Sequence, residues 1–85
     1  MFLYSAEFKK RYKKLPRSAK EKTIARLELL AQDEFAPLLN NHPLRGKYEA
    51  YRSINITGDI RLVYCKPEPG TYFLVTIGTH SQLYE

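Results

Sequence analysis

The 85 residues suffice for one small domain, residues 1–85, and a content of 44% hydrophobic and 13% aromatic side chains excludes an intrinsically disordered chain. The longest uncharged apolar stretches, such as FLVTIG, are far shorter than the roughly 20 residues of a membrane-spanning helix, and the single Cys65 excludes an intrachain disulfide. The formal net charge is +5, and the N-terminus lacks the pattern of a secretory signal, so we expect a cytoplasmic protein.

The first residues of the chain predict a short strand followed by a helix. The apolar start MFLY favours a strand. Ser5 is of the residue type that caps a helix, and the helix should run to about Leu15. Pro16 ends it, because proline cannot continue the backbone hydrogen bonds of a helix.

A second helix is the clearest element in the sequence. Ser18 and Glu21 have the S-x-x-E spacing of a capping box and predict where it begins. It should end near Asp33, ahead of Pro37. The apolar stripe expected to face the core consists of Ile24, Leu27, Leu30 and Ala31.

The positive charge is concentrated in this helical half. Between residues 9 and 22 the only acid is Glu21, against the basic residues Lys9, Lys10, Arg11, Lys13, Lys14, Arg17, Lys20 and Lys22. This density favours a polyanionic partner or an acidic protein. The alternative is a solvated helical face that keeps the protein soluble, and charge alone does not separate these interpretations.

The second half of the chain predicts an antiparallel meander. Residues 34–47 have the Pro, Asn and Gly content of a connecting loop. Three strand-like segments then follow, separated by the turns TGD and KPEPG: residues 48–56, 60–65 and 71–79. The predicted fold class is therefore α+β, with the order β-α-α-β-β-β. Both helices should pack on one face of a small, mainly antiparallel sheet, which leaves the other face open.

The two histidines, His42 and His80, both lie at the ends of predicted elements. Such positions present side chains to ligands, and imidazole is the side chain that normally titrates near neutral pH. The alternative for each is an ordinary solvated loop histidine.

Strand alternation separates the polar residues of the meander. Arg52 is in phase with Ile54 and Ile56, which places it at a margin of the sheet. Arg61 is in phase with Val63 and Cys65, opposite the face of Ile60, Leu62 and Tyr64, and is expected on the open face. Asp59 follows a glycine, where ordinary turn chemistry accounts for it.

The sequence contains no recognisable metal or cofactor motif. His42, Cys65 and His80 are widely spaced, and no C-x-x-C or H-x-x-x-H pair occurs. Neither G-x-G-x-x-G nor a phosphate-binding loop is present. Cys65 lies inside an alternating strand, where cysteine usually behaves as a small hydrophobic residue. We therefore expect no metal and no cofactor.

Four segments carry a resemblance to a known family: HPLRG from residue 42, YR from 51, DIRLVY from 59 and GTHSQLY from 78. With them the chain resembles the RelE/ParE superfamily of toxins from prokaryotic toxin–antitoxin operons, and within it the YafQ-like messenger-RNA interferases. The segments span about half of the chain in the expected order. The helical half is similar only in pattern and basicity.

The resemblance implies a microbial-ribonuclease-like (RelE-like) fold whose open sheet face holds messenger RNA in the ribosomal A site, with the basic helices against ribosomal RNA. Cleavage in the family uses the substrate's own 2′-hydroxyl and gives a 2′,3′-cyclic phosphate without a metal. The implied partners are the ribosome, messenger RNA and a cognate antitoxin, with no membrane involved. The free toxin is expected to be monomeric.

The resemblance also implies the roles of single residues. His42 or His80 would act as base or acid, Asp59 would assist, Arg61 would hold the phosphate and Tyr84 would stack on a base or donate its hydroxyl. The implied RNA-binding residues are Lys9, Lys10, Lys13, Lys14, Lys47, Arg52 and Asn55. Asn55 is a departure, because the YafQ-like pattern often has a histidine there and an amide cannot move protons.

Two alternatives remain from the sequence. One is a non-enzymatic inhibitor of DNA gyrase, as in the ParE-like members of the superfamily. The other is a degenerate toxin that only binds its antitoxin. The pair of histidines favours the nuclease, because a protein that only binds its target needs no titrating pair.

Overall fold

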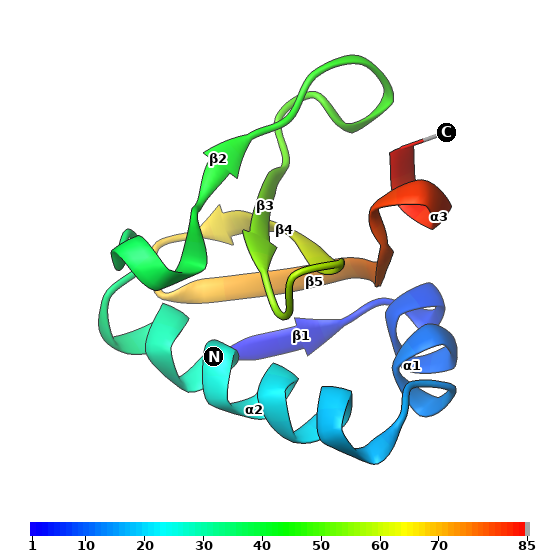
Figure 1. The fold of residues 1–85 in the computed structure, drawn as a ribbon. Helices are drawn as coiled ribbons and strands as arrows, with labels where there is room; N and C mark the ends of the chain where they lie inside the picture. Colours follow the sequence, from blue (N-terminus) through cyan, green and yellow to red (C-terminus); the bar gives the residue numbers. More distant parts are fainter. Residues whose placement is uncertain (85) are drawn as a thin grey trace.

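The computed structural model describes residues 1–84, which form a five-stranded mixed sheet with three α-helices (Figure 1). The strands lie in the order β1-β5-β4-β3-β2, with β1 parallel to β5 and the other neighbours antiparallel. The elements are β1 (Phe2–Tyr4), α1 (Ala6–Lys13), α2 (Arg17–Gln32), β2 (His42–Pro43), β3 (Arg52–Asn55), β4 (Ile60–Glu68), β5 (Thr71–Thr79) and α3 (His80–Tyr84). Two 3₁₀ turns, η1 (Pro37–Leu39) and η2 (Gly46–Tyr48), flank β2.

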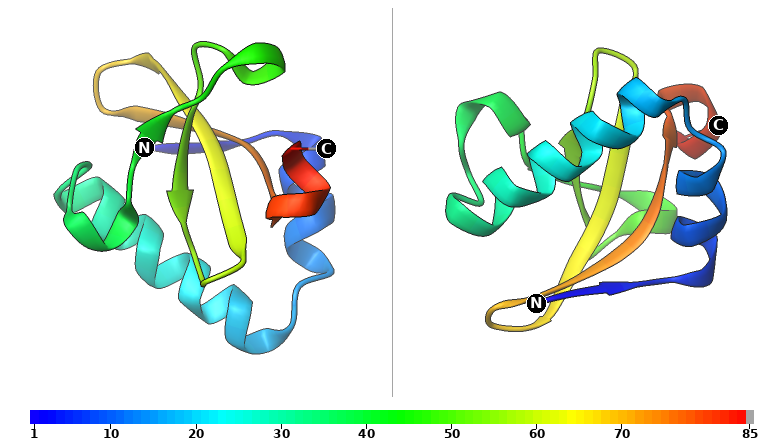
Figure 2. Two further views of the ribbon diagram at one scale, coloured as in Figure 1. Left: turned by 45° about the horizontal axis from the view of Figure 1, so that its top comes forward. Right: turned by 90° about the horizontal axis from the view of Figure 1, so that it is seen from below.

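This architecture confirms the predicted α+β class and adds two elements to the predicted order. The first is β2, a two-residue edge strand in the segment that the sequence predicts as loop. The second is α3, which follows β5 without an intervening residue and lies at the far end of that strand (Figure 2). Among the helices of residues 1–84, none has both the length and the apolar character needed to cross a membrane.

The start of α1 follows the prediction. The Ser5 Oγ accepts a hydrogen bond from the Phe8 backbone N–H at 2.9 Å, and its hydroxyl donates to the Val75 carbonyl at 2.6 Å. The capping residue therefore also joins the helix to β5. The helix buries Phe8 and ends at Lys13, two residues before the expected end.

The start of α2 does not follow the prediction. Arg17 is its first residue, and the N-cap is Pro16, so the capping box proposed for Ser18 and Glu21 is wrong. The φ of Pro16 is −61°, and its carbonyl accepts from the Lys20 N–H at 3.0 Å. Glu21 instead lies 3.3 Å from the Arg17 Nε, one turn away. The backbone of Pro16 is extended, with a ψ of 157°, as is usual for an N-cap residue, and no side chain caps this helix.

The buried face of α2 is rotated relative to the predicted stripe. Leu27 and Leu30 are buried as expected, but Ile24 is 52% exposed. In the N-terminal half of the helix, the buried face is instead formed by Ala19 and Thr23. The Thr23 hydroxyl donates to the Ala19 carbonyl at 2.7 Å, so this polar side chain is buried without an unsatisfied group.

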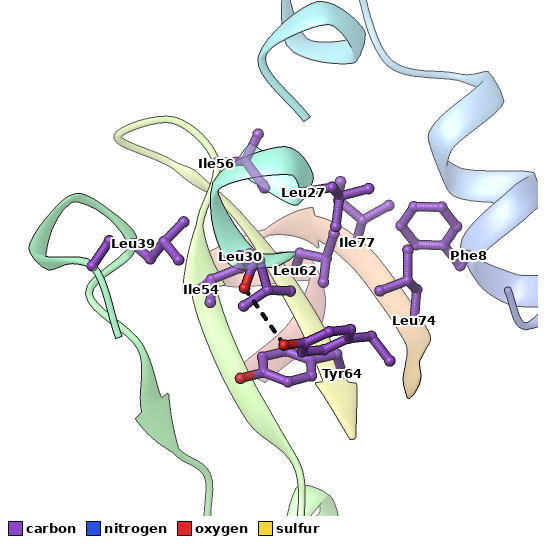
Figure 3. Close-up of a cluster of buried hydrophobic side chains, with 12 residues drawn as sticks. Phe8, Leu27, Leu30, Leu39, Ile54, Ile56, Leu62, Tyr64, Leu74 and Ile77 are labelled. Atoms are coloured by element: carbon purple, nitrogen blue, oxygen red, sulfur yellow. Dashed lines mark hydrogen bonds between the residues drawn. The ribbon is translucent and has the colours of Figure 1, made fainter. Parts of the chain in front are cut away.

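The core lies between α2 and one face of the sheet (Figure 3). Ile54 pairs with Leu62 and Leu62 pairs with Ile77, so the three side chains form one row across β3, β4 and β5. All three are fully buried, as is Leu30 above them. Because alternate residues of a strand point to opposite faces, the residues directly before and after each of these three in its own strand face away from α2.

A hydrogen-bond network at one side of the core ties the segment after α2 to the sheet. The buried Tyr64 hydroxyl donates to the Glu34 carboxylate at 2.6 Å and accepts from the Asn41 side-chain amide at 2.7 Å. Lys66 Nζ lies 2.9 Å from the other Glu34 oxygen, and Arg52 Nε donates to Asn41 at 2.6 Å. The segment that leads into β2 is thereby fixed to β3 and β4.

The network shifts two acid–base equilibria. Burial, and then the hydrogen bond to Glu34, raise the pKa of Tyr64 above its ordinary value. For Glu34, burial acts to raise the pKa, but hydrogen bonds from Tyr64 and Lys66 and the charge of Lys66 outweigh it and hold the pKa below its ordinary value. Glu34 therefore stabilises the fold at pH values above its ordinary pKa, and this contribution is lost as pH falls through the lowered folded pKa.

We predict that Tyr64→Phe lowers the free energy of unfolding at pH 7 by about 1–2 kcal/mol, because it keeps the ring and removes two hydrogen bonds. The loss should be smaller at pH 3, because Glu34 loses its charge as pH falls through its lowered folded pKa and a hydrogen bond to a charged acceptor is the stronger one. Urea unfolding at both pH values measures this difference. Tyr12→Phe is the control, since that hydroxyl has only a 3.5 Å contact with the Lys20 carbonyl. An equal loss at both pH values would contradict the role assigned to Glu34.

Candidate active site

A cleft opens on the face of the sheet that points away from α2, and its lining residues come from β2, β3, β4, α3 and the segments that flank β2. Four of the five predicted catalytic residues line it together: His42, Arg61, His80 and Tyr84. Asn40, Leu44 and Ser53 complete the lining. The tertiary structure therefore brings together residues from both ends of the meander.

His42 is positioned by β2 and by the turn that precedes it. The residue pairs with Ser53 of β3, and its Nδ1 lies 2.9 Å from the Asn40 carbonyl oxygen. A carbonyl can only accept a hydrogen bond, so Nδ1 carries the hydrogen. In the neutral ring, Nε2 then keeps its lone pair. Asn40 reaches this position with a φ of +46°, a conformation that asparagine tolerates well.

Arg61 lies near the start of β4 and is held there by the turn between β3 and β4. Its Nη1 donates to the carbonyls of Thr57 and Gly58, both at 3.1 Å. Within residues 1–84 all its hydrogen bonds come from Nη1, including a longer one to the Ile60 carbonyl. The N–H groups of Nε and Nη2 are thus available to an anion, and the position on the open face is as predicted from strand alternation.

The short helix α3 is fixed by a capping box that the sequence interpretation missed. The Thr79 hydroxyl accepts from the Gln82 N–H at 3.1 Å, and the Gln82 side chain accepts from the Thr79 N–H at 2.8 Å. The pattern T-x-x-Q in residues 79–82 could have predicted this start. Gly78 permits the close approach, since a Cβ there would lie 2.7 Å from the Gln82 Oε1. The absence of a side chain at Gly78 therefore lets α3 pack closely on the sheet. The strand β5 does not end at this glycine but continues to Thr79.

His80 and Tyr84 lie on α3 with their rings in contact. The ring centroids are 4.8 Å apart in an edge-to-face arrangement. The Tyr84 hydroxyl donates to the Ser53 Oγ at 3.1 Å, which joins α3 to β3 across the cleft. Ser53 is fully buried and was not among the predicted site residues. Its phase with Asn55 on the open face is the only signal in the sequence that points to it.

Asp59 lies beside the cleft without lining it. Its backbone carbonyl accepts from the His80 N–H at 3.1 Å, so the turn between β3 and β4 supports the start of α3. The side chain is exposed, and within residues 1–84 it has no hydrogen bond to His42 or His80. The catalytic assistance expected of Asp59 stays a prediction.

Two of the predicted RNA-binding residues lie away from the cleft. Arg52 pairs with Tyr64, on the same face as the core, and stacks 5.2 Å from the Phe35 ring. This is the sheet margin predicted for it. Asn55 lines a separate hollow with Lys22 and Arg26 of α2.

The predicted basic residues divide between two regions. Lys47 lies next to the cleft, with its ammonium 5.3 Å from the Tyr48 ring centroid. Lys10 and Lys14 line a different cleft, between α1 and α3, and Lys9 lines a groove between α1 and α2. Lys13 is exposed on α1. The helical lysines are therefore separate from the candidate active site.

Residues 1–84 contain no group of three His, Cys, Asp or Glu side chains arranged to hold a metal ion. Burial raises the pKa of the Cys65 thiol, which disfavours the thiolate needed by a nucleophile. The chemistry available in the cleft is therefore that of two imidazoles, a guanidinium and a phenol. Such groups move protons and stabilise negative charge that develops on a phosphate.

Comparisons with known proteins agree with this fold. The family model described as "Bacterial toxin of type II toxin-antitoxin system, YafQ" matches residues 1–85. No curated protein matches. The crystal structure of YafQ from E. coli strain BL21(DE3) is 21% identical, with a TM-score of 0.85 over 100% of this chain and 98% of that one.

Two further solved structures are similar over almost their full length. A metal-bound toxin from Helicobacter pylori is 29% identical, with a TM-score of 0.72 over 99% of this chain and 98% of that one. YafQ in the E. coli DinJ-YafQ complex is 24% identical, with a TM-score of 0.73 over 100% and 98% of the two chains. Since the family model spans the entire sequence, the protein belongs to the YafQ family of bacterial toxins of type II toxin–antitoxin systems.

Proposed function

We propose that this YafQ-family toxin is a ribosome-dependent, metal-independent endoribonuclease that cleaves messenger RNA in the A site, in the cytoplasm. The observation that supports the proposal is the meeting of His42, His80 and Arg61 in one open cleft. A protein that acts only by binding has no need of two imidazoles next to a guanidinium. The open sheet face gives a single RNA strand access to all three side chains.

The proposed reaction is a transesterification within the RNA. The 2′-oxygen attacks the adjacent phosphorus as its proton passes to a base, and the bond between phosphorus and the 5′-oxygen breaks. An acid protonates the departing 5′-oxygen. The products are a 2′,3′-cyclic phosphate and a free 5′-hydroxyl, so no water is consumed and no oxidant or metal is needed.

The geometry favours His42 as the base and His80 as the acid. The Nδ1 of His42 donates to the Asn40 carbonyl, which leaves Nε2 as a proton acceptor directed away from that turn. Arg61, anchored through Nη1, offers Nε and Nη2 to the phosphate oxygens as charge increases on them. Tyr84 supports His80 through the contact between their rings, and its hydrogen bond to Ser53 joins α3 to β3.

We further propose that a cognate antitoxin neutralises the protein. The E. coli YafQ is found in complex with DinJ, and the basic surface of this chain suits an acidic or amphipathic segment that folds on binding. The free toxin is expected to be a monomer. Light scattering of the isolated protein should give the mass of one chain, and a stable dimer would contradict this expectation.

The decisive experiment is toe-printing of a defined message on translating ribosomes. The wild-type protein should produce a break within the A-site codon, and His80→Ala should abolish it. Glu68→Ala is the matched control, because this exposed residue at the opposite end of β4 is remote from the cleft. If the wild-type protein gives no break, the gyrase-inhibitor and binding-only alternatives replace the nuclease, and DNA damage on induced expression separates those two.

We predict that Arg61→Lys lowers the cleavage rate about 10²- to 10³-fold, because lysine replaces a planar set of donors by a single ammonium. Single-turnover cleavage on programmed ribosomes measures the rate. Arg17→Lys on the outer face of α2, where the side chain is 93% exposed, should cleave like the wild type. A rate for Arg61→Lys within about threefold of wild type would exclude the proposed phosphate contact.

A further inference from the structure

A row of aromatic rings continues from the candidate active site into residues 46–51, here called the η2 segment, which comprise η2 and the turn that follows it. The rings of Tyr84 and Tyr48 meet edge to face with centroids 6.2 Å apart, and those of Tyr48 and Tyr51 are tilted at the same distance. His80 begins the row on the other side of Tyr84. Tyr48 and Tyr51 are half-buried and do not belong to the core cluster under α2. Core packing therefore does not account for them.

The backbone that carries these two tyrosines is strained. Ala50, between them, has a φ of +77°, in the left-handed region that residues with a Cβ rarely occupy, and Gly46 at the start of η2 has +67°. Hydrogen bonds of 3.0 Å from Tyr51 N–H to the Tyr48 carbonyl and from Leu44 N–H to the Tyr51 carbonyl hold the segment in place. Strain of this kind is retained where function requires a particular side-chain arrangement.

The segment that carries the row has two basic residues, Arg45 and Lys47, against one acid, Glu49. Lys47 is exposed, and its ammonium lies 5.3 Å from the Tyr48 ring centroid. An accessible aromatic ring beside a flexible cation is the combination with which proteins bind single-stranded nucleic acid: the ring stacks on a base and the cation contacts a phosphate. When a base stacks on Tyr48, the Lys47 ammonium is free to move to the backbone phosphate.

We propose that Tyr48, flanked by Tyr51 and Lys47, is the stacking site for the base of a nucleotide next to the scissile bond. This inference rests on the proposed function and extends it to one neighbouring nucleotide. Stacking strength sets the preference of such a site, so a purine should bind there better than a pyrimidine. An aromatic pair of this kind also suits a protein interface, but its continuity with His80 and Tyr84 favours the RNA.

The test uses ribosomes programmed with a message in which the nucleotide whose 2′-oxygen attacks the scissile phosphate lacks its 2′-hydroxyl, so that binding occurs without cleavage. The fluorescent purine 2-aminopurine replaces, in turn, the nucleotide on each side of it. The wild-type protein should quench the fluorescence at one of the two positions. Tyr48→Leu, which keeps apolar bulk but has no ring, should abolish the quenching and weaken binding about fivefold to a hundredfold.

Tyr48→Phe is the matched variant and should retain both quenching and affinity, since stacking needs the ring and not the hydroxyl. Thermal unfolding of the variants separates lost stacking from lost folding. Unchanged quenching with a folded Tyr48→Leu variant would overturn the proposal. A Tyr48→Leu variant that binds RNA normally but is no longer neutralised by the antitoxin would also overturn it, and would assign the row to the protein interface. Absence of cleavage of an all-ribose message by the wild-type protein would instead refute the proposed function.

Discussion

The antiparallel register of β3, β4 and β5 is the constraint on which the rest of the structure depends. It aligns Ile54, Leu62 and Ile77 in one row beneath α2. Because side chains alternate, the same register places Ser53 and Arg61 on the opposite face, where the cleft forms. A shift by one residue would exchange the faces and expose the core row to water. Core burial therefore maintains the geometry of the candidate active site.

The two histidines depend on separate supports that converge on this sheet. His42 follows the segment that Asn41 and Glu34 tie to Tyr64 on the core side, so a network on one face positions a side chain on the other. His80 depends on the capping box of α3 and on the Asp59 carbonyl. Loss of either support should displace one imidazole without unfolding the sheet.

Charge and chemistry are divided between two surfaces of the molecule. Lys9, Lys10 and Lys14 line clefts outside the sheet face. The cleft between β2 and α3 holds the imidazoles and Arg61. The function that we propose, cleavage of a ribosome-bound message, would use both kinds of surface, one for a large polyanion and one for a single phosphate. The strained, aromatic η2 segment extends the second surface along the path that we propose for the RNA.

Local patterns of the sequence determined the α+β class, the Ser5 cap, the full extent of β5 and the open-face position of Arg61, because capping and strand alternation act over a few residues. Only tertiary structure decided the buried face of α2, since the expected stripe left out the back-bonded Thr23. It also decided β2, whose two residues form a strand only by pairing with β3. The meeting of His42 and His80 in one cleft depends on pairings between distant segments, and no local pattern encodes such pairings.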